Sequence, residues 1–376
     1  MKKFVNVEDY RQAARRRLPR IAFDYLDPGA EDGLTCRLNR QNLHDIHFEP
    51  RVLQGVAAAD VDLAINTFGI PSRLPLAIAP TGFAGLFWPQ ADLGLARCAA
   101  QAGIPYIMST ASTMSIEEVA RQTDNGATRW FQLYLLNDRD ATEAMVERAR
   151  DAAYSALVLT VDTPCAGKRE ASLRHGSRLP LRLDAEKLLD FARHPGWAWQ
   201  MVRHGQPRLA NFPYSRKEPF VMETHLKRRI DWDDVRWLRQ AWPGPLILKG
   251  VQSVLDARLA SEHGLDAIVV SNHGGRQLDG AQSPMQALGM ITQAVGQNLT
   301  VMADSGFRRG SDVIKALACG AHSIWLGRAT LYGMAARGPQ GAAHVLSIIE
   351  DEMRRTMTLL GVGSLAELNA SLIRRA

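Results

Sequence analysis

One short unit recurs along the chain from residue 76 onward: an apolar strand-like segment, a polar or glycine-containing end, and then an amphipathic helical segment. Strands that alternate with helices form parallel sheets, and eight such units close into a TIM barrel. A doubly wound sheet normally has fewer units and opens with G-x-G-x-x-G, which this sequence lacks. We therefore expect an α/β fold, a TIM (β/α)8 barrel. The eight predicted strands are residues 76–80, 104–108, 130–133, 156–162, 245–249, 267–271, 300–304 and 323–327.

The chain of 376 residues is long enough for one such barrel with additions. We expect a single domain over residues 1–376, with the barrel core at about residues 76–340. Two helical segments should precede it between Val7 and Leu26, because apolar residues repeat there at helical spacing and Pro19 interrupts them. About 80 residues separate the fourth predicted strand from the fifth, and loops of that length are usually functional. This predicts a long insertion at about residues 165–230.

Polar side chains or glycines follow every predicted strand. A TIM barrel builds its active site from the C-terminal ends of its strands, so these residues should meet at one mouth. Each alone could be a helix cap or a turn residue, but all eight ends share the property. In chain order they are Pro80, Thr81, Gly82, Ser109, Gln132, Tyr134, Thr160, Asp162, Lys249, Ser271, His273, Arg276, Asp304, Gly306, Arg308, Gly327 and Arg328.

The loops after the last two strands predict a phosphate site. This fold commonly binds phosphate there, and the segments ADSGFRRGSD and LGRATLYG supply glycines for close backbone approach and free N–H groups at helix starts. Arg308 and Arg328 add two cations for a dianion. The residues alone leave FMN, pyridoxal phosphate and a sugar phosphate open as the phosphate-bearing group.

Composition excludes several other classes of protein. The net charge is +6, but acids lie among the basic residues and no nucleic-acid-binding motif accompanies them, so we expect no nucleic-acid partner. The four cysteines are scattered without C-x-x-C spacing, which argues against a zinc site or a disulfide framework, and no metal is expected. No run of 18 apolar residues occurs and the first residues are charged, so we expect a cytoplasmic protein.

The stretch SNHGGRQLDG, residues 271–280, gives the most specific signal. It resembles the signature of the FMN-dependent enzymes that oxidise L-2-hydroxy acids, the family of glycolate oxidase, L-lactate dehydrogenase and (S)-mandelate dehydrogenase. His-Gly-Gly alone would be weak, but the other motifs follow in the right order on the strand ends. The segments STASTMSIEEVARQ, WFQLY and DSGFRRGSDVIKALA look most like (S)-mandelate dehydrogenase, whereas HPGWAWQ and MTLLG look like bacterial L-lactate dehydrogenases.

The resemblance implies roles for the polar residues around the substrate. Oxidising a 2-hydroxy acid requires a base, cations for the carboxylate and an electron sink beside the α-carbon. By this resemblance His273 would be the base, and Asp162 would be the carboxylate that pairs with it. Arg276 and Arg169 would bind the substrate carboxylate with their guanidinium groups, and Tyr25 would also contact that carboxylate. Tyr134 would contact the substrate hydroxyl.

The resemblance also implies that the phosphate-bearing cofactor is FMN. Lys249 would face the N1 region of the flavin, Asp304 would hold the ribityl chain, and the phosphate would lie among Gly306, Arg308, Gly327 and Arg328. The remaining flavin contacts implied are Pro80, Thr81, Gly82, Ser109, Gln132, Tyr134, Thr160 and Ser271.

The expected activity is oxidation of an L-2-hydroxy acid of the (S)-mandelate or L-lactate type to the 2-oxo acid. Gly82 stands where glycolate oxidase has alanine, and members with glycine there tend to react poorly with oxygen, which favours a quinone or another electron acceptor. Ala111 stands where glycolate oxidases have tryptophan and leaves room for a bulkier substrate. The alternatives are an oxidase that forms H2O2, a TIM-barrel lyase using Lys249 as a Schiff base, and a non-catalytic flavin- or phosphate-binding barrel.

Residues 181–217 mix aromatic and basic side chains, a composition that suits the surface of a membrane. In the family, mandelate and lactate dehydrogenases use the corresponding segment to bind the inner membrane, so we expect a peripheral contact with its inner face. A lid whose tryptophans pack on the barrel rim is the alternative. The resemblance further implies a homo-oligomer, commonly a tetramer.

Overall fold

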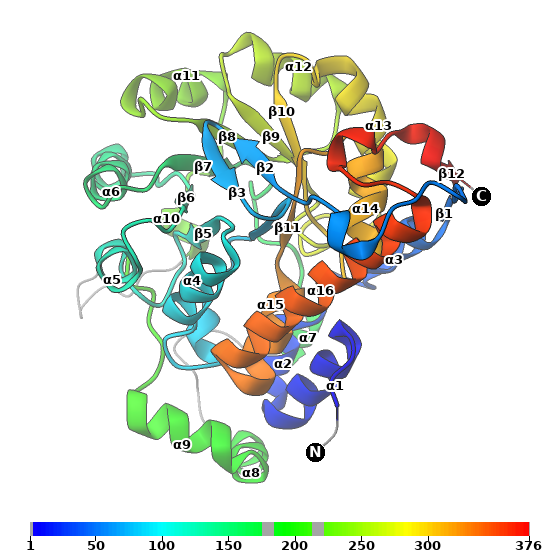
Figure 1. The fold of residues 1–376 in the computed structure, drawn as a ribbon. Coiled ribbons are helices and arrows are strands. Elements are labelled where there is room, and N and C mark those ends of the chain that lie inside the picture. The colour runs from blue at the N-terminus through cyan, green and yellow to red at the C-terminus, as the bar shows by residue number, and fades with distance from the viewer. Residues whose placement is uncertain (1–2, 175–183, 213–221, 376) are drawn as a thin grey trace.

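The computed structural model describes residues 3–174, 184–212 and 222–375, and its centre is a closed barrel of eight parallel strands (Figure 1). The predicted TIM barrel is confirmed, and each predicted strand is present with its ends within two residues. The closed barrel excludes the doubly wound sheet. Its strands are β4 (Leu76–Ile78), β5 (Tyr106–Ser109), β6 (Arg129–Leu133), β7 (Ala156–Thr160), β8 (Leu246–Val251), β9 (Ala267–Val270), β10 (Thr300–Ala303) and β11 (Ser323–Leu326).

Helices surround the strands, as the alternating pattern predicted (Figure 1). A capping box of Ser115 and Glu118 starts one of them, and Ser253 caps another. These helices are α4 (Ala91–Ala102), α5 (Ile116–Gln122), α6 (Arg139–Asp151), α11 (Trp232–Ala241), α12 (Val254–Glu262), α13 (Pro284–Val295), α14 (Gly310–Ala318) and α15 (Arg328–Arg337), followed by α16 (Pro339–Leu360). Short 3-10 turns are η1 (Ala58–Asp60), η2 (Ala84–Leu86), η3 (Leu365–Glu367) and η4 (Ala370–Leu372).

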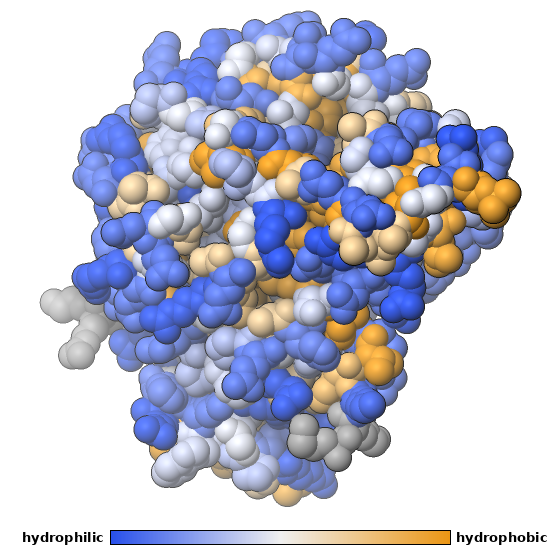
Figure 2. Space-filling view, viewed as in Figure 1, coloured by the Kyte–Doolittle hydropathy of each residue, from blue (hydrophilic) through white to orange (hydrophobic). Residues whose placement is uncertain are grey.

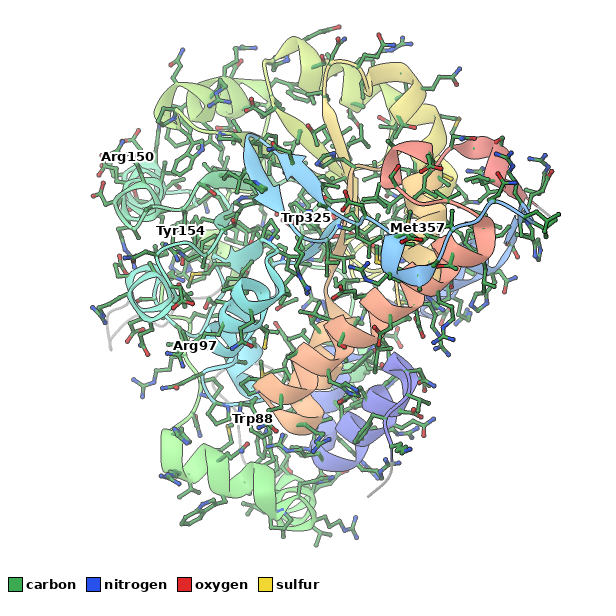
Figure 3. The ribbon with its side chains drawn as sticks, in the orientation of Figure 1. Trp88, Arg97, Arg150, Tyr154, Trp325 and Met357 are labelled. Carbon is green, nitrogen blue, oxygen red and sulfur yellow. The ribbon has the colours of Figure 1, made fainter. Side chains whose placement is uncertain are left out.

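The barrel interior is packed with side chains and is closed at the N-terminal ends of its strands. Trp130 and Trp325 fill its centre with ring centroids 5.8 Å apart. Trp325 is fully buried and lies near the middle of the view in Figure 3. The hairpin of β2 (Ile65–Thr67) and β3 (Ile70–Ser72) places Phe68 against Trp130, at 5.9 Å between centroids. Any ligand site within the barrel must therefore open at the C-terminal ends.

The chain termini add helices and a small sheet outside the barrel. Helices α1 (Val7–Arg17) and α2 (Arg20–Leu26) are the two predicted segments, and Pro19 stands at the break between them. They are followed by α3 (Leu34–His44), while β1 (Ile46–Phe48) pairs antiparallel with β12 (Ile373–Arg375). Because α1 packs on α15, the α2 segment is brought close to the barrel mouth.

The insertion after β7 contains α7 (Glu170–Arg174), α8 (Ala185–Arg193), α9 (Pro195–His204) and α10 (Met222–His225). In Figure 1, α8 and α9 form a pair that projects at the lower edge of the molecule. Trp197 on α9 is buried and its Nε1 donates to the Leu86 carbonyl at 2.8 Å, whereas Trp199 is 65% exposed. Three basic residues of the predicted surface segment, Arg182, Arg216 and Lys217, lie outside the described residues.

Candidate active site

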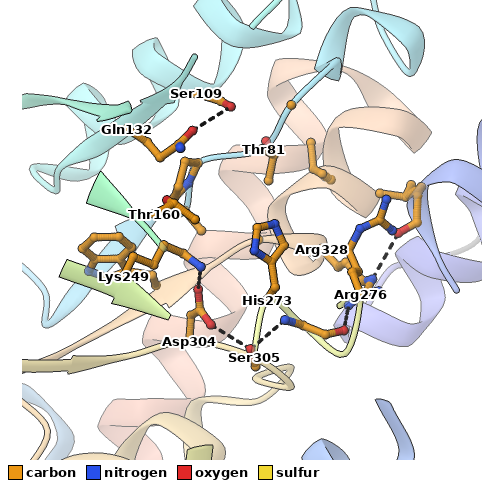
Figure 4. A pocket seen from close by; sticks show the side chains of 18 of the residues that line it. Thr81, Ser109, Gln132, Thr160, Lys249, His273, Arg276, Asp304, Ser305 and Arg328 are labelled. Carbon is orange, nitrogen blue, oxygen red and sulfur yellow. Dashed lines mark hydrogen bonds and ion pairs between the residues drawn. The ribbon is translucent and has the colours of Figure 1, made fainter. Parts of the chain in front are cut away.

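The ends of the strands surround a cavity that encloses about 1100 Å³ of space, including its open mouth (Figure 4). Of the predicted site residues, only Asp162 and Ser271 do not line it, and both lie directly behind residues that do. Its lining includes Tyr25, Pro80, Thr81, Gly82, Ser109, Gln132, Tyr134, Thr160, Arg169, Lys249, His273, Arg276, Asp304, Gly306, Arg308, Gly327 and Arg328.

His273 and Asp162 form a pair at the cavity wall. The imidazole Nδ1 lies 2.9 Å from Asp162 Oδ1, which leaves Nε2 as the ring nitrogen available to a ligand. Gly250 makes this possible, because a Cβ there would lie 2.7 Å from the Cβ of Asp162. Gly250 also has a φ of 109° and forms a bulge, so β8 continues to Val251 and does not end at Lys249 as predicted.

Burial sets the protonation states of this pair. Burial lowers the pKa of His273 below its usual value, although the charge of Asp162 acts in the opposite direction. Burial opposes ionisation of Asp162, but the adjacent imidazole and Lys249 lower the pKa of that carboxyl overall. The pair therefore combines a neutral imidazole, able to accept a proton, with a carboxylate that stabilises the imidazolium once it forms.

The Arg276 guanidinium has two other guanidinium groups near it in the cavity, those of Arg169 and Arg328. Burial lowers the pKa of Arg276, and the neighbouring charges of Arg169 and Arg328 lower it further. The Arg276 guanidinium also lies 5.4 Å from the centroid of the Tyr25 ring, which itself packs near Phe87. Cations that repel one another in a partly buried site are stabilised by a bound anion, so this side of the cavity suits a carboxylate.

Lys249 is buried at the floor of the site and forms an ion pair. Its Nζ lies 3.0 Å from Asp304 Oδ2, and the two side chains are only 5% and 10% exposed. Burial acts to lower the pKa of Lys249, but Asp304 and Asp162 outweigh it and raise the pKa overall. The amine is therefore protonated and not available as a nucleophile, which argues against the Schiff-base lyase.

The loops after β10 and β11 form a cationic lobe of the cavity. Arg308 lies here with its guanidinium over the Tyr332 ring at 5.3 Å, and burial lowers its pKa. Gly306 has a φ of 96°, and a Cβ there would lie 2.6 Å from the Asn39 carbonyl oxygen, so only glycine fits. Helices α14 and α15 begin next to these loops. The N–H groups of Arg308 and Arg309 donate to Asp312 and that of Gly310 donates to Glu352, so the free N–H groups predicted for a phosphate are already occupied at the start of α14.

Arg328 has a second role that its sequence position does not indicate. Its guanidinium donates to three backbone carbonyls, those of Leu26 at 3.1 Å, Pro28 at 2.8 Å and Gly274 at 2.7 Å. It therefore links the segment after α2 to the loop of His273, in addition to lining the cavity (Figure 4).

The comparisons with known proteins agree with this geometry. The family model described as FMN-dependent dehydrogenase matches residues 14–375. The chain belongs to the FMN-dependent dehydrogenases. It is 43% identical to (S)-mandelate dehydrogenase of Pseudomonas putida over 97% of this chain and 92% of that one. It is 41% identical to L-lactate dehydrogenase of Pectobacterium atrosepticum over 96% and 95% of the two chains.

Among solved structures, the chain resembles a crystal structure of the monotopic membrane protein (S)-mandelate dehydrogenase. The TM-score is 0.95, at 41% identity over 100% of both chains. The predicted family and fold are thereby confirmed, and the protein is an oxidoreductase whose family uses FMN.

The cavity of this FMN-dependent dehydrogenase fits its cofactor. Within the described residues, the buried atoms Gln132 Nε2 and Thr160 Oγ1 have no hydrogen-bond partner, although both residues line the cavity wall. Buried polar atoms are rarely left unpaired, so a polar-edged ligand is expected there. Ser109 fixes the Gln132 amide by donating to its Oε1 at 3.0 Å. Together with Lys249, these groups suit the polar edge of a flavin, while the cationic lobe suits its phosphate.

Some residues of the site could not be predicted from their type. Phe87, Trp325 and Leu331 line the cavity but read in the sequence as ordinary apolar core. Ser305 also lines it, between Asp304 and Gly306, which were both predicted. A left-handed serine, with a φ of 76°, could have been suspected only from its place in the tight DSGF turn.

The described residues contain no group of three or more His, Cys, Asp or Glu side chains that could hold a metal ion. Within those residues, no helix is both long and apolar enough to span a bilayer.

Proposed function

We propose that this protein oxidises an L-2-hydroxy acid of the (S)-mandelate or L-lactate type to the 2-oxo acid, with FMN as cofactor. The observation that supports it most is the convergence, in one cavity, of the His273–Asp162 pair with the guanidinium groups of Arg276 and Arg169. A base in the same cavity as two carboxylate-binding cations provides a proton acceptor for the hydroxy acid and positive charge for its carboxylate.

In the proposed mechanism, Arg276 and Arg169 bind the substrate carboxylate, with Tyr25 beside them. Burial raises the pKa of Tyr134, so its hydroxyl stays neutral and can donate to the substrate hydroxyl. His273 Nε2 accepts the proton that leaves the substrate, and Asp162 stabilises the resulting imidazolium. When bound, FMN would supply the electron sink for this oxidation.

Residues of the floor and of the cationic lobe would hold the cofactor. We propose that the flavin ring is faced by Lys249, Gln132, Thr160 and Ser109 and further surrounded by Pro80, Thr81, Gly82, Tyr134 and Ser271. Asp304 would bind the ribityl chain. The phosphate would be bound by Gly306, Arg308, Gly327 and Arg328. The protonated Lys249 would stabilise negative charge on the reduced ring.

The apolar walls of the cavity favour a substrate with a bulky side chain. Phe87, Tyr25 and Leu331 line it together with the small Ala111. A Cβ on Gly82 would lie 2.9 Å from the Cβ of Ala111, so the two small residues are in close contact and a larger side chain at either position would displace the other. This apolar lining supports an aromatic substituent, as in mandelate, over the methyl group of lactate.

Anaerobic reduction of the flavin tests the proposal. The purified protein should be yellow, and its flavin absorption should bleach when an L-2-hydroxy acid is added without oxygen, faster with (S)-mandelate than with L-lactate. Reoxidation should then be faster with a soluble quinone than with oxygen, which distinguishes a dehydrogenase from an H2O2-forming oxidase. A yellow protein that no 2-hydroxy acid bleaches would instead support a non-catalytic flavin-binding barrel.

We propose that α8 and α9 bind the inner face of the cytoplasmic membrane peripherally. Their exposed apolar residues include Leu188, Leu189, Trp199 and Val202, with Arg193 and Arg203 nearby in the same helices. In Figure 2 the visible side of this end is largely hydrophilic, with hydrophobic surface at its lower margin. An apolar surface with adjacent basic residues suits an anionic lipid interface.

Replacing Trp199 and Val202 with serine should lower partitioning onto vesicles containing phosphatidylglycerol by at least about tenfold, since burying such a side chain contributes roughly 1.5–3 kcal/mol. Cosedimentation measures the effect. Leu255→Ser, at a residue 68% exposed on α12, is the matched control and should bind as the unsubstituted protein does. Equal binding by all three proteins would leave the lid as the role of α8 and α9.

We also propose that the protein assembles as a homo-oligomer, a tetramer. The elution volume on a calibrated size-exclusion column would test this.

A further inference from the structure

The backbone of His273 is held in a conformation that disfavours any residue other than glycine. Its φ is 57°, and Gly274 and Gly275 continue with φ values of 68° and 71°. A left-handed residue with a side chain costs about 1–3 kcal/mol and persists only when its surroundings impose it. The loop therefore needs specific contacts to hold the imidazole in place.

Two serine hydroxyls provide such contacts to consecutive peptide groups. The His273 N–H donates to Ser271 Oγ at 3.0 Å, and the Gly274 N–H donates to Ser305 Oγ at 2.8 Å. The two N–H groups that flank the His273 side chain are thus held by hydroxyls from two different strand ends, those of β9 and β10. Arg328 holds the same peptide segment from its other side through the Gly274 carbonyl, at 2.7 Å.

Both hydroxyls are in turn attached to one buried ion pair. Lys249 Nζ donates to Ser271 Oγ at 2.9 Å, and Ser305 Oγ donates to Asp304 Oδ1 at 2.7 Å. Since Lys249 and Asp304 lie 3.0 Å apart, the four side chains form a closed network with the backbone of the His273 loop. Figure 4 shows the part of it formed by Lys249, Asp304 and Ser305. Hydrogen bonds to charged groups are stronger than neutral ones, so an ion pair is a firm support for both hydroxyls.

We propose that Ser271 and Ser305 are positioning residues that fix the backbone of His273 against the Lys249–Asp304 ion pair. This proposal rests on the proposed function in one respect, the assignment of His273 as the base. It assigns Ser271 and Ser305 a role in the proton-transfer step, in which neither side chain takes part directly. Because the same ion pair faces the cofactor cavity, one pair of charges serves both the flavin site and the base.

Ser305 offers the sharper test, because two substitutions separate its hydrogen bond from its strain. Ser305→Ala removes the hydroxyl and keeps a side chain at a φ of 76°. Ser305→Gly removes the hydroxyl and relieves the strain, so it should have a Tm at least as high as that of the alanine variant. Both should lower kcat by about tenfold, since small misplacements of a catalytic group are costly. The KM and the Kd for FMN should change less than twofold.

Steady-state turnover with a dye acceptor gives kcat and KM, and quenching of FMN fluorescence on binding to the apoprotein gives the Kd. Ser72→Ala is the matched control, because it removes a buried hydroxyl that donates to the Leu74 carbonyl at 2.8 Å, at the opposite end of the barrel. It should keep the kcat of the unsubstituted protein.

Wild-type kcat in both Ser305 variants would overturn the proposal, as would full recovery in Ser305→Gly alone, which would assign the effect to strain. A fall in kcat explained entirely by weaker FMN binding would also overturn it. His273→Asn, assayed in parallel, separates this proposal from the function: if that variant turns over normally, the base is wrong. If it is inactive while Ser305→Ala is fully active, only the positioning role fails.

Discussion

His273→Ala should lower kcat by at least roughly two orders of magnitude, the usual contribution of a positioned general base. The imidazole lines the cavity, its Nδ1 is occupied by Asp162 at 2.9 Å, and burial keeps it neutral. Alanine removes the proton acceptor but keeps the backbone N–H that donates to Ser271. FMN should therefore remain bound, and the protein should stay yellow while its bleaching by substrate slows.

The control is His322→Ala, which removes a partly buried imidazole hydrogen-bonded to Thr67 at 2.8 Å at the closed end of the barrel. This variant should keep its kcat even if its Tm falls.

The pH dependence of kcat/KM in the unsubstituted protein gives a second check on His273 as the base. Since burial lowers the pKa of His273, the base form persists below the ordinary histidine pKa of about 6.5, and kcat/KM should decline only at lower pH. Undiminished turnover in His273→Ala would remove the assignment of the base.

The barrel could be predicted because its signal is local. Each strand and its following helix have their own periodicity and caps, such as those of Ser115 and Ser253, so the repeat is visible without knowing any long-range contact. The closure of the barrel floor has no such signal. Phe68 reaches Trp130 across more than sixty intervening residues, and β1 pairs with β12 from the other end of the chain. Contacts of that kind depend on the finished fold.

The residues of the candidate site likewise fall into those that could be predicted from the sequence and those that could not. His273, Arg276 and Asp304 stand out because polar groups at strand ends are chemically conspicuous. Ser305 is conspicuous only through the hydrogen bonds it makes in space, and Gly250 only through the approach of Asp162 from the neighbouring strand. Residue type identified the groups suited to contact a ligand. The groups that hold them in position became visible only in three dimensions.

The Arg276→Met substitution should lower the activity of the protein without lowering its stability. The guanidinium is partly buried beside Arg169 and Arg328, and those like charges lower its pKa together with burial, so its removal relieves repulsion in the folded state. The contacts given up are one hydrogen bond to the Pro28 carbonyl at 3.2 Å and the cation–π contact with the Tyr25 ring at 5.4 Å. We therefore expect a Tm that is unchanged or higher, measured by differential scanning calorimetry of the FMN-bound protein.

Its kcat/KM should nevertheless fall by at least about 100-fold, because truncating one side of a buried charge pair costs roughly 2–5 kcal/mol and each 1.4 kcal/mol is tenfold. Arg276→Lys keeps the charge without the two-pronged guanidinium geometry and should recover only part of the loss. Equal activity in the lysine variant would mean that charge alone binds the carboxylate. A cation that is held in place to bind an anion destabilises the protein until that anion is bound, so its removal should not lower the Tm. A drop in Tm that parallels the loss of activity would therefore mean that Arg276 has a structural role.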